Sequence, residues 1–163
     1  MSVTNNNSTN NSTNNSTNNT TSVGTTDAQI CPFCDIAQAE SPRSNHPRII
    51  AENDYAFIIR DAYPVSSGHS LIIPKRHIGS YFKTSKGEKV CIAELLELAK
   101  KQLDQEFQPD AYNIGINDGP AAGQTVAHCH LHVIPRYAVE GEDPRGGVRW
   151  VVADKADYWS GGE

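Results

Sequence analysis

Charged and aromatic side chains are missing from the first 26 residues of this 163-residue chain. The segment instead repeats a four-residue unit of Asn, Ser and Thr between residues 6 and 21. Because so few apolar side chains cannot offset the entropy of ordering the chain, we predict that residues 1–26 form a disordered low-complexity tail. A basic stretch followed by an apolar one is also lacking at this end, so we expect no secretion signal.

The chain also lacks a long apolar run and an excess of basic residues. No run approaches the roughly 20 apolar residues that cross a bilayer, so we expect no membrane association. Its 14 Lys and Arg against 19 Asp and Glu give a net charge of −5, all of it within residues 27–163. A mildly acidic domain is a poor nucleic-acid binder, which needs a basic face. We therefore expect residues 27–163 to form one compact cytoplasmic domain.

Cysteine is scarce, and only two of the four cysteines lie close together. Cys31 and Cys34 form a Cys-x-x-Cys motif, whereas Cys91 and Cys129 stand alone. Without a secretion signal, such a pair indicates half a zinc site or a redox pair before a structural disulfide. A closed zinc site needs four ligands, so two more would have to come from elsewhere in the chain.

One long helix stands between two groups of short strands. Ser85 and Glu88 resemble a capping box, and the apolar periodicity that follows predicts a helix ending before Pro109. We expect strands at residues 49–52, 56–61, 70–74, 111–116 and 126–134, with a further short extended piece at 148–153. This order is not a simple βαβ alternation, so it favours an α+β fold with a mainly antiparallel sheet.

Three of the six histidines alternate along one predicted strand, as His128, His130 and His132. Alternate residues of a strand share a face, so the three rings are expected to point the same way. One interpretation is a catalytic metal bound by all three. It is disfavoured because the outer Cα atoms of a straight strand lie about 13 Å apart, whereas zinc holds its ligand atoms at about 2 Å.

The favoured interpretation makes His130 a nucleophile that its two neighbours assist. A neutral imidazole, with an ordinary pKa of about 6.5, is a good nucleophile at cellular pH. Attack on phosphorus would give a covalent phospho-imidazole, which water then hydrolyses.

The segment His-Cys-His-Leu-His-Val-Ile at 128–134 resembles the His-x-His-x-His-x-x signature of the histidine triad (HIT) family. Residues 117–126 resemble the loop before the triad in the branch of the fragile histidine triad protein and the bacterial diadenosine polyphosphate hydrolase-like proteins. Residues 67–77 resemble an earlier strand of the family, and residues 143–150 resemble a C-terminal segment of its bacterial members. This resemblance implies that residues 27–163 are a HIT domain. Its fold would be a mainly antiparallel five-stranded sheet with one long helix and a short N-terminal helix.

The resemblance also implies catalytic roles. His130 would attack the α-phosphorus, and His132 would hydrogen-bond a phosphate oxygen near the leaving group. Gln124 and Thr125 would supply donors to the developing negative charge. Members of the transferase branch carry Gln at the third triad position, so His132 favours hydrolysis over transfer.

Substrate-binding roles are implied for three more residues. Asn117 would face the phosphate site, and His69 would support His128 or the wall of the site. Asp61 stands where the family binds the ribose hydroxyls, which a carboxylate can accept in pairs. A strand-end turn residue is nearly as good an interpretation of Asp61.

Family members with the N-terminal cysteine pair complete a zinc site with two histidines, which correspond here to His77 and His128. The resemblance therefore implies a structural zinc on Cys31, Cys34, His77 and His128, and no organic cofactor. Such a zinc would hold His128 rigid two residues from the nucleophile. A reduced, empty pair and a redox pair are the alternatives.

The sequence thus predicts a hydrolase of dinucleoside polyphosphates or nucleoside phosphoramidates that forms a nucleotidyl-histidine intermediate, and the resemblance suggests a homodimer. One alternative is a nucleotide-binding module with little catalysis. Another is a zinc-dependent hydrolase with the triad as metal ligands. The sequence does not name the nucleotide.

Overall fold

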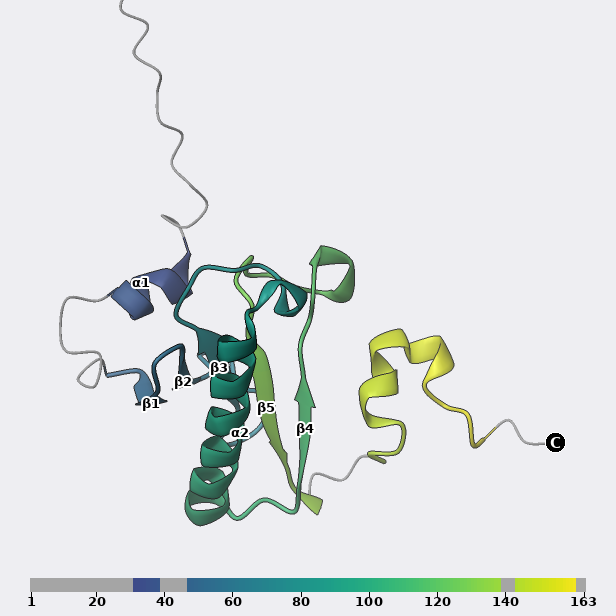
Figure 1. The fold of residues 1–163 in the computed structure, drawn as a ribbon. Coiled ribbons are helices and arrows are strands. Elements are labelled where there is room, and N and C mark those ends of the chain that lie inside the picture. Colours follow the sequence, from purple (N-terminus) through teal and green to yellow (C-terminus); the bar gives the residue numbers. More distant parts are fainter. Residues whose placement is uncertain (1–30, 39–46, 139–142, 161–163) are drawn as a thin grey trace, which may run out of the picture.

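The computed structural model describes residues 31–38, 47–138 and 143–160. The predicted tail, residues 1–26, lies outside the described residues. The secondary-structure elements follow in chain order in Figure 1: α1 (Pro32–Gln38), β1 (Ile49–Glu52), β2 (Ala56–Arg60), β3 (Ser70–Pro74), the short 3₁₀ helix η3 (Tyr81–Lys83), α2 (Lys86–Phe107), β4 (Ala111–Gly115), η4 (Pro120–Ala122), β5 (Leu131–Arg136) and the 3₁₀ helix η6 (Gly147–Lys155).

The five strands form one sheet in the order β1-β2-β3-β5-β4. Every neighbouring pair is antiparallel. The register places Leu71 of β3 opposite His132 of β5, and Gly115 of β4 opposite the same histidine. The predicted α+β class, the five-stranded antiparallel sheet and the short N-terminal helix are confirmed.

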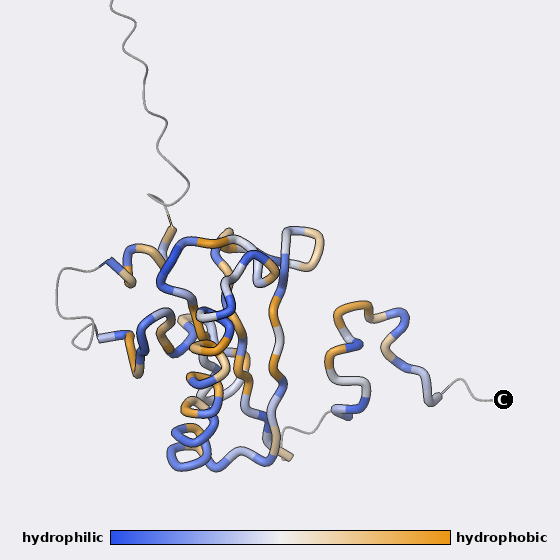
Figure 2. The backbone as a smooth tube through the Cα atoms, in the orientation of Figure 1, coloured by the Kyte–Doolittle hydropathy of each residue, from blue (hydrophilic) through white to orange (hydrophobic). Residues whose placement is uncertain are grey.

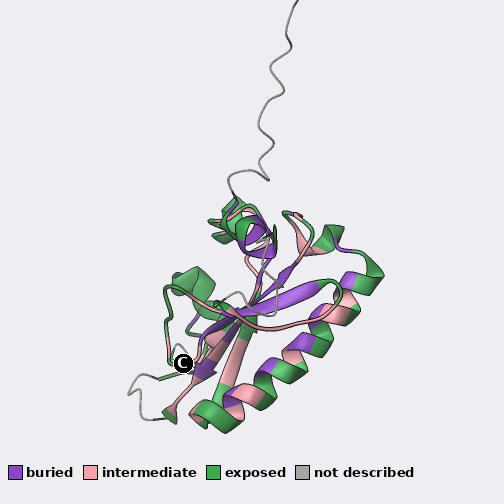
Figure 3. Cartoon of the chain, turned by 90° about the vertical axis from the view of Figure 1, so that its left-hand side faces the viewer, coloured by how far each residue is buried: buried purple, intermediate pink, exposed green. Residues whose placement is uncertain are grey.

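The sheet separates two apolar layers, because successive strand residues face opposite sides. On one face Ile58, Ile72 and Val133 pack against the apolar stripe of α2. On the other face Phe57 and Ile73 join a cluster with the buried side of α1. Figure 2 shows the apolar residues of the strands, and Figure 3 shows that the buried positions of α2 recur along one side of the helix. His132 shares the face of its register partner Leu71, which is the α1 face.

The start of α2 matches the predicted capping box. The Ser85 hydroxyl accepts from the Glu88 amide at 3.2 Å, and the Glu88 carboxylate accepts from the Ser85 amide at 2.7 Å. Glu88 is buried and also receives two hydrogen bonds from Arg76, both 2.9 Å long. The helix is thereby tied to the segment that follows β3.

Strand β5 begins at Leu131, five residues later than the predicted strand 126–134. Continued past Leu131, the ladder with β3 would reach Pro74, which has no N–H to donate. Instead, the Cys129 amide donates to the carbonyl of Ile78 at 2.6 Å. His128 and His130 therefore lie before the strand, and the alternation rule that placed three histidines in one row applies to His132 alone.

The predicted extended piece at 148–153 was also wrong, because these residues belong to the 3₁₀ helix η6. Valines at 148, 151 and 152 favour a strand. Among the described residues, however, the sheet ends at β4, and residues 148–153 do not pair with it. Local 3₁₀ hydrogen bonds satisfy the backbone of such a segment instead. Within the described residues, no helix combines the length and apolar character needed to cross a membrane.

Candidate active site

A cluster of two cysteines and two histidines lies beside α1. The ligand atoms of Cys31, Cys34, His77 and His128 all lie within 4.8 Å of one another, which makes them a possible metal site. Nδ1 of His128 lies 3.4 Å from Sγ of Cys31 and 3.6 Å from Sγ of Cys34. Nδ1 of His77 lies 3.2 Å from Sγ of Cys34. The structure thus brings together the four residues that the resemblance implied.

The His128 ring presents an unprotonated nitrogen to this cluster. Its Nε2 lies 2.8 Å from the carbonyl oxygen of Pro74, which can only accept, so Nε2 carries the proton and Nδ1 keeps its lone pair. Burial lowers the pKa of His128 to about 4 against the opposing effect of the Pro74 hydrogen bond. Burial and a hydrogen bond with Cys31 raise the pKa of the Cys34 thiol to about 11. A bound cation would reverse that effect, since thiolates are the metal-binding form.

His130 is buried, and one of its nitrogens is fixed by the backbone. Nδ1 of His130 lies 2.8 Å from the carbonyl oxygen of His128. The carbonyl can only accept, so Nδ1 is the protonated nitrogen of the neutral ring, and Nε2 carries the lone pair. The ring also meets Phe33 edge to face, with centroids 5.3 Å apart, and His132, with centroids 5.0 Å apart.

His132 is half-buried and is paired with the buried imidazole of His69. Nε2 of His69 lies 3.0 Å from Nδ1 of His132. The Val65 amide donates to Nδ1 of His69, and Oδ2 of Asp61 lies 3.4 Å from the same nitrogen. In the neutral ring that Val65 favours, Nε2–H of His69 donates to His132, and Nε2 of His132 then carries a proton. Burial, followed by the nearby charges of His130 and His69, lowers the pKa of His132 to about 4.

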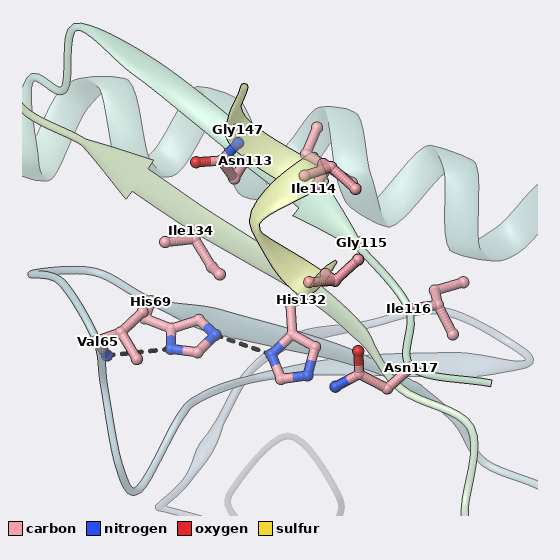
Figure 4. Close-up of a pocket in the computed structure, with 12 residues that line it drawn as sticks. Val65, His69, Asn113, Ile114, Gly115, Ile116, Asn117, His132, Ile134 and Gly147 are labelled. Carbon is pink, nitrogen blue, oxygen red and sulfur yellow. Dashed lines mark hydrogen bonds between the residues drawn. The ribbon is translucent and has the colours of Figure 1, made fainter. Parts of the chain in front are cut away.

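A pocket of about 350 Å³ opens beside His132, between β4, β5 and η6 (Figure 4). Most of its lining is apolar, and its polar groups are the rings of His69 and His132 and the side-chain amides of Asn113 and Asn117. Its apolar lining comes from Val65, Ile114, Ile116, Ile134, Val148 and Val151. Of the predicted site residues, this pocket gathers His69, Asn117 and His132.

Two further predicted residues, Gln124 and Thr125, belong to the loop before the triad. The Gln124 amide group bridges two backbone groups, accepting from the Gly119 N–H and donating to the Gly79 carbonyl, each at 2.8 Å. This leaves the Gln124 side chain shaping the loop before the triad. Thr125 is exposed at the end of that loop. Their predicted roles toward a phosphate stay predictions.

Phe33, Asn113 and two valines of η6, Val148 and Val151, border the site but were not predicted from the sequence. Phe33 lies between the two motif cysteines, so its proximity to the cluster was open to inference. The lining by Val148 and Val151 was not, because those residues were expected to be extended and nothing placed them near β4.

Comparison with known proteins identifies a HIT domain over residues 43–139. The chain is 36% identical to the adenylylsulfatase HINT3 of Arabidopsis thaliana, over 65% of this chain and 52% of that protein. It is 30% identical to a bis(5'-adenosyl)-triphosphatase of Saccharomyces cerevisiae, over 70% of this chain and 53% of that protein. The chain thus spans about half the length of these two relatives.

The fold also matches solved structures. A zinc-bound histidine triad family protein from Mycobacterium smegmatis superposes with a TM-score of 0.61 at 32% identity, covering 71% of this chain and 81% of that one.

Proposed function

Since the chain belongs to the histidine triad family, whose domain model matches residues 43–139, we propose that it hydrolyses nucleotides through a covalent intermediate on His130. The adenylylsulfatase and the bis(5'-adenosyl)-triphosphatase are relatives with hydrolase names, and they support nucleotide hydrolysis at the level of the family. The names of these relatives favour dinucleoside polyphosphates and adenylyl compounds as the substrate class. Nucleoside phosphoramidates are the second class that the same chemistry would accept.

One observation carries the assignment of the nucleophile. The hydrogen bond from His130 Nδ1 to the His128 carbonyl leaves the Nε2 lone pair available in the neutral ring. This lone pair attacks the α-phosphorus, a P–N bond forms, and the bond from phosphorus to the leaving group breaks. Water then attacks the same phosphorus, the P–N bond breaks, and His130 returns with its lone pair.

His132 is the proposed donor to the leaving group. With His69 donating to its Nδ1, His132 presents Nε2–H at the pocket beside the triad. A proton placed there neutralises the leaving oxygen or nitrogen as its bond to phosphorus breaks. Asn117 lines the same pocket and is proposed to contact the phosphate, together with Gln124 and Thr125. Asp61 is proposed to bind the ribose hydroxyls.

We further propose that Cys31, Cys34, His77 and His128 hold a structural zinc. The donor set of two thiols and two imidazoles suits tetrahedral zinc, and the four ligand atoms already converge. The zinc-bound relative supports the same assignment. Zinc would fix the position of His128, whereas the reaction itself is carried by His130 and His132.

The domain is proposed to extend over residues 27–163, around the matched segment 43–139, and to form a cytoplasmic homodimer. Strand β4 ends the described sheet, and its Ile114 is 44% exposed. Val148 and Val151 of the neighbouring helix η6 are also exposed. An edge strand with apolar neighbours is a surface that a second copy would cover.

The nucleophile is tested with the variant His130→Ala and a panel of diadenosine polyphosphates and adenosine phosphoramidates. We expect turnover to fall by about 10³-fold or more while AMP binding persists. The matched control is His132→Gln, which should retain the nucleophile. With a nitrophenyl ester of AMP, whose leaving group needs no proton, it should still form a nucleotidyl-protein adduct detectable by mass spectrometry, whereas His130→Ala should form none.

Two outcomes would contradict this proposal. Near wild-type turnover by His130→Ala would exclude His130 as the nucleophile. Absence of turnover by the wild-type chain on every substrate, with tight nucleotide binding, would instead favour a nucleotide-binding module.

A further inference from the structure

Phe33 lies at the point where the metal-binding cluster meets the proposed nucleophile. It stands between Cys31 and Cys34 in sequence and is 8% exposed in α1. Its ring contacts His130 at a centroid distance of 5.3 Å and an interplanar angle of 65°. It also contacts His128 at 5.8 Å and 77°. One aromatic side chain thus touches both a cluster histidine and the catalytic histidine.

The hydrogen bond from Nδ1 to the His128 carbonyl does not by itself fix the His130 ring. A histidine ring rotates about its Cβ–Cγ bond over a broad range, so its plane has to be set by packing. Two rings flank it, those of Phe33 and His132. His132 is held by His69, and Phe33 is held by α1.

The geometry points to Phe33 as a positioning residue for catalysis: we propose that its ring edge sets the plane of His130 and so aims Nε2 at the substrate phosphorus. This inference rests on the proposed role of His130 as nucleophile. Phe33 donates no proton and needs no contact with the substrate. Its effect comes through the orientation of the ring beside it, because in-line attack depends on the direction of the lone pair.

Helix α1 packs Phe33 and its other buried side chains against one face of the sheet. The helix has only seven residues, and its buried side chains are Phe33, Cys34, Ile36 and Ala37. Ile36 and Phe33 belong to the same apolar cluster against β2 and β3. Of the two, only Phe33 makes ring contacts with the histidines. Ile36 is therefore a matched control, since its truncation opens a cavity in the same cluster without removing a ring contact to His128 or His130.

The test compares Phe33→Ala, Phe33→Leu and Ile36→Ala in the full zinc-loaded chain. Steady-state kinetics would be measured with the diadenosine polyphosphate or phosphoramidate that the wild type cleaves. Bound zinc per chain and the thermal midpoint would be recorded for each variant. The ¹H–¹³C spectrum of the histidine rings supplies a readout independent of turnover, with the His130 signals assigned by their loss in His130→Ala.

We expect Phe33→Ala to lower kcat by about 10- to 100-fold, with KM within about threefold of wild type. Its His130 ring signals should shift or broaden, because the neighbouring ring current is lost and the imidazole gains freedom. Ile36→Ala should keep wild-type kcat and unshifted His130 signals even if its thermal midpoint falls. Phe33→Leu keeps apolar volume without a flat edge, so its kcat should lie between those of wild type and Phe33→Ala.

Equal losses of kcat in Phe33→Ala and Ile36→Ala, or His130 signals unmoved by Phe33→Ala, would overturn the inference. If Phe33→Ala loses zinc or does not fold, Phe33→Leu decides, and wild-type kcat with wild-type His130 signals in that variant rejects the role. Failure of the proposed function is distinguishable, because it appears as undiminished turnover in His130→Ala whatever Phe33 does.

Discussion

Nε2 of His69, the residue before β3, lies 3.0 Å from Nδ1 of His132 in β5, so two imidazoles share one part-buried hydrogen bond. Burial lowers the pKa of both rings, although the Asp61 carboxylate opposes the shift at each. Two neutral rings can share the bond only if one nitrogen is protonated and the other is not. The tautomer of His132, and with it the proton that faces the pocket, therefore depends on His69.

The first prediction concerns this dependence. His69→Leu removes the donor to Nδ1 of His132, so the His132 ring is no longer held in the tautomer that carries its proton on Nε2. We expect kcat to fall by about 10- to 100-fold for a substrate whose leaving group needs a proton. A nitrophenyl ester of AMP, whose leaving group departs as a stable anion, should lose much less. Parallel kcat measurements on both substrates check this.

The control for His69→Leu is Val65→Ala, which keeps the backbone amide that faces His69. It should leave the ratio between the two substrates at the wild-type value. An equal loss of kcat on both substrates in His69→Leu would show that His69 does not act through leaving-group protonation.

The fold was largely predictable because its signals are local. The capping box formed by Ser85 and Glu88, the helix end before Pro109 and the strand 70–74 were each confirmed. Each depends on chemistry within a few residues, such as a side chain that caps a backbone amide or a proline that ends a ladder. The fold class followed from their order along the chain.

The arrangement of the histidines was less predictable, since it depends on contacts across the fold. Alternation predicted one row, but the β3–β5 ladder ends at the pair of Ile72 and Leu131, and the segment before Leu131 follows another path. His128 turns to the cysteines and donates to the Pro74 carbonyl, contacts that join residues more than 50 positions apart. The spacing of these residues in the sequence does not predict such contacts. The residues of the metal-binding cluster were predicted from the resemblance to a family instead.

The second prediction concerns the pH dependence of stability. Hydrogen bonds from Arg76 hold the pKa of Glu88 at about 2, below its ordinary value of 4.5. Because the folded-state pKa is depressed, the contribution of Glu88 to stability is fully present above pH 4.5. It is lost as the pH falls from 4.5 toward 2. Chemical denaturation at several pH values should show this decline.

Glu88→Gln should lower the free energy of unfolding by about 2 kcal/mol at neutral pH, because a buried charged hydrogen-bonding group is lost. The difference between the variant and the wild type should shrink below pH 4.5. Glu97→Gln, at an exposed position of the same helix, is the matched control and should stay close to wild type. A difference that is constant from pH 7 to pH 3 would contradict the assigned role of the Arg76 pair.

The third prediction concerns the metal. The wild-type chain should bind about one zinc ion, and Cys34→Ser should lose most of it, because a closed structural zinc site depends on four protein ligands. Since zinc bound to the folded state stabilises it, Cys34→Ser should also lower the thermal midpoint by roughly 5–10 °C. Metal analysis of the purified chains and thermal unfolding with and without a chelator check both expectations.

Cys91→Ser is the control for that substitution. Cys91 is a free cysteine on α2 and is not a member of the cluster. Its replacement should leave the zinc content and the response to chelator unchanged. Full zinc occupancy in Cys34→Ser, or a wild-type thermal midpoint that a chelator does not move, would show that these residues hold no structural zinc.

The last prediction concerns the sheet edge at β4. If two copies join there, a charge on the exposed Ile114 should separate them, because it would be buried at the interface without a partner. We expect the wild type to sediment at twice the mass of one chain and Ile114→Arg at the mass of one. Phe82→Arg is the matched control, since Phe82 is 82% exposed but lies in η3 (Tyr81–Lys83), outside the strands of the sheet. This variant should sediment like the wild type, whereas a wild-type chain that stays monomeric at high concentration would contradict the homodimer.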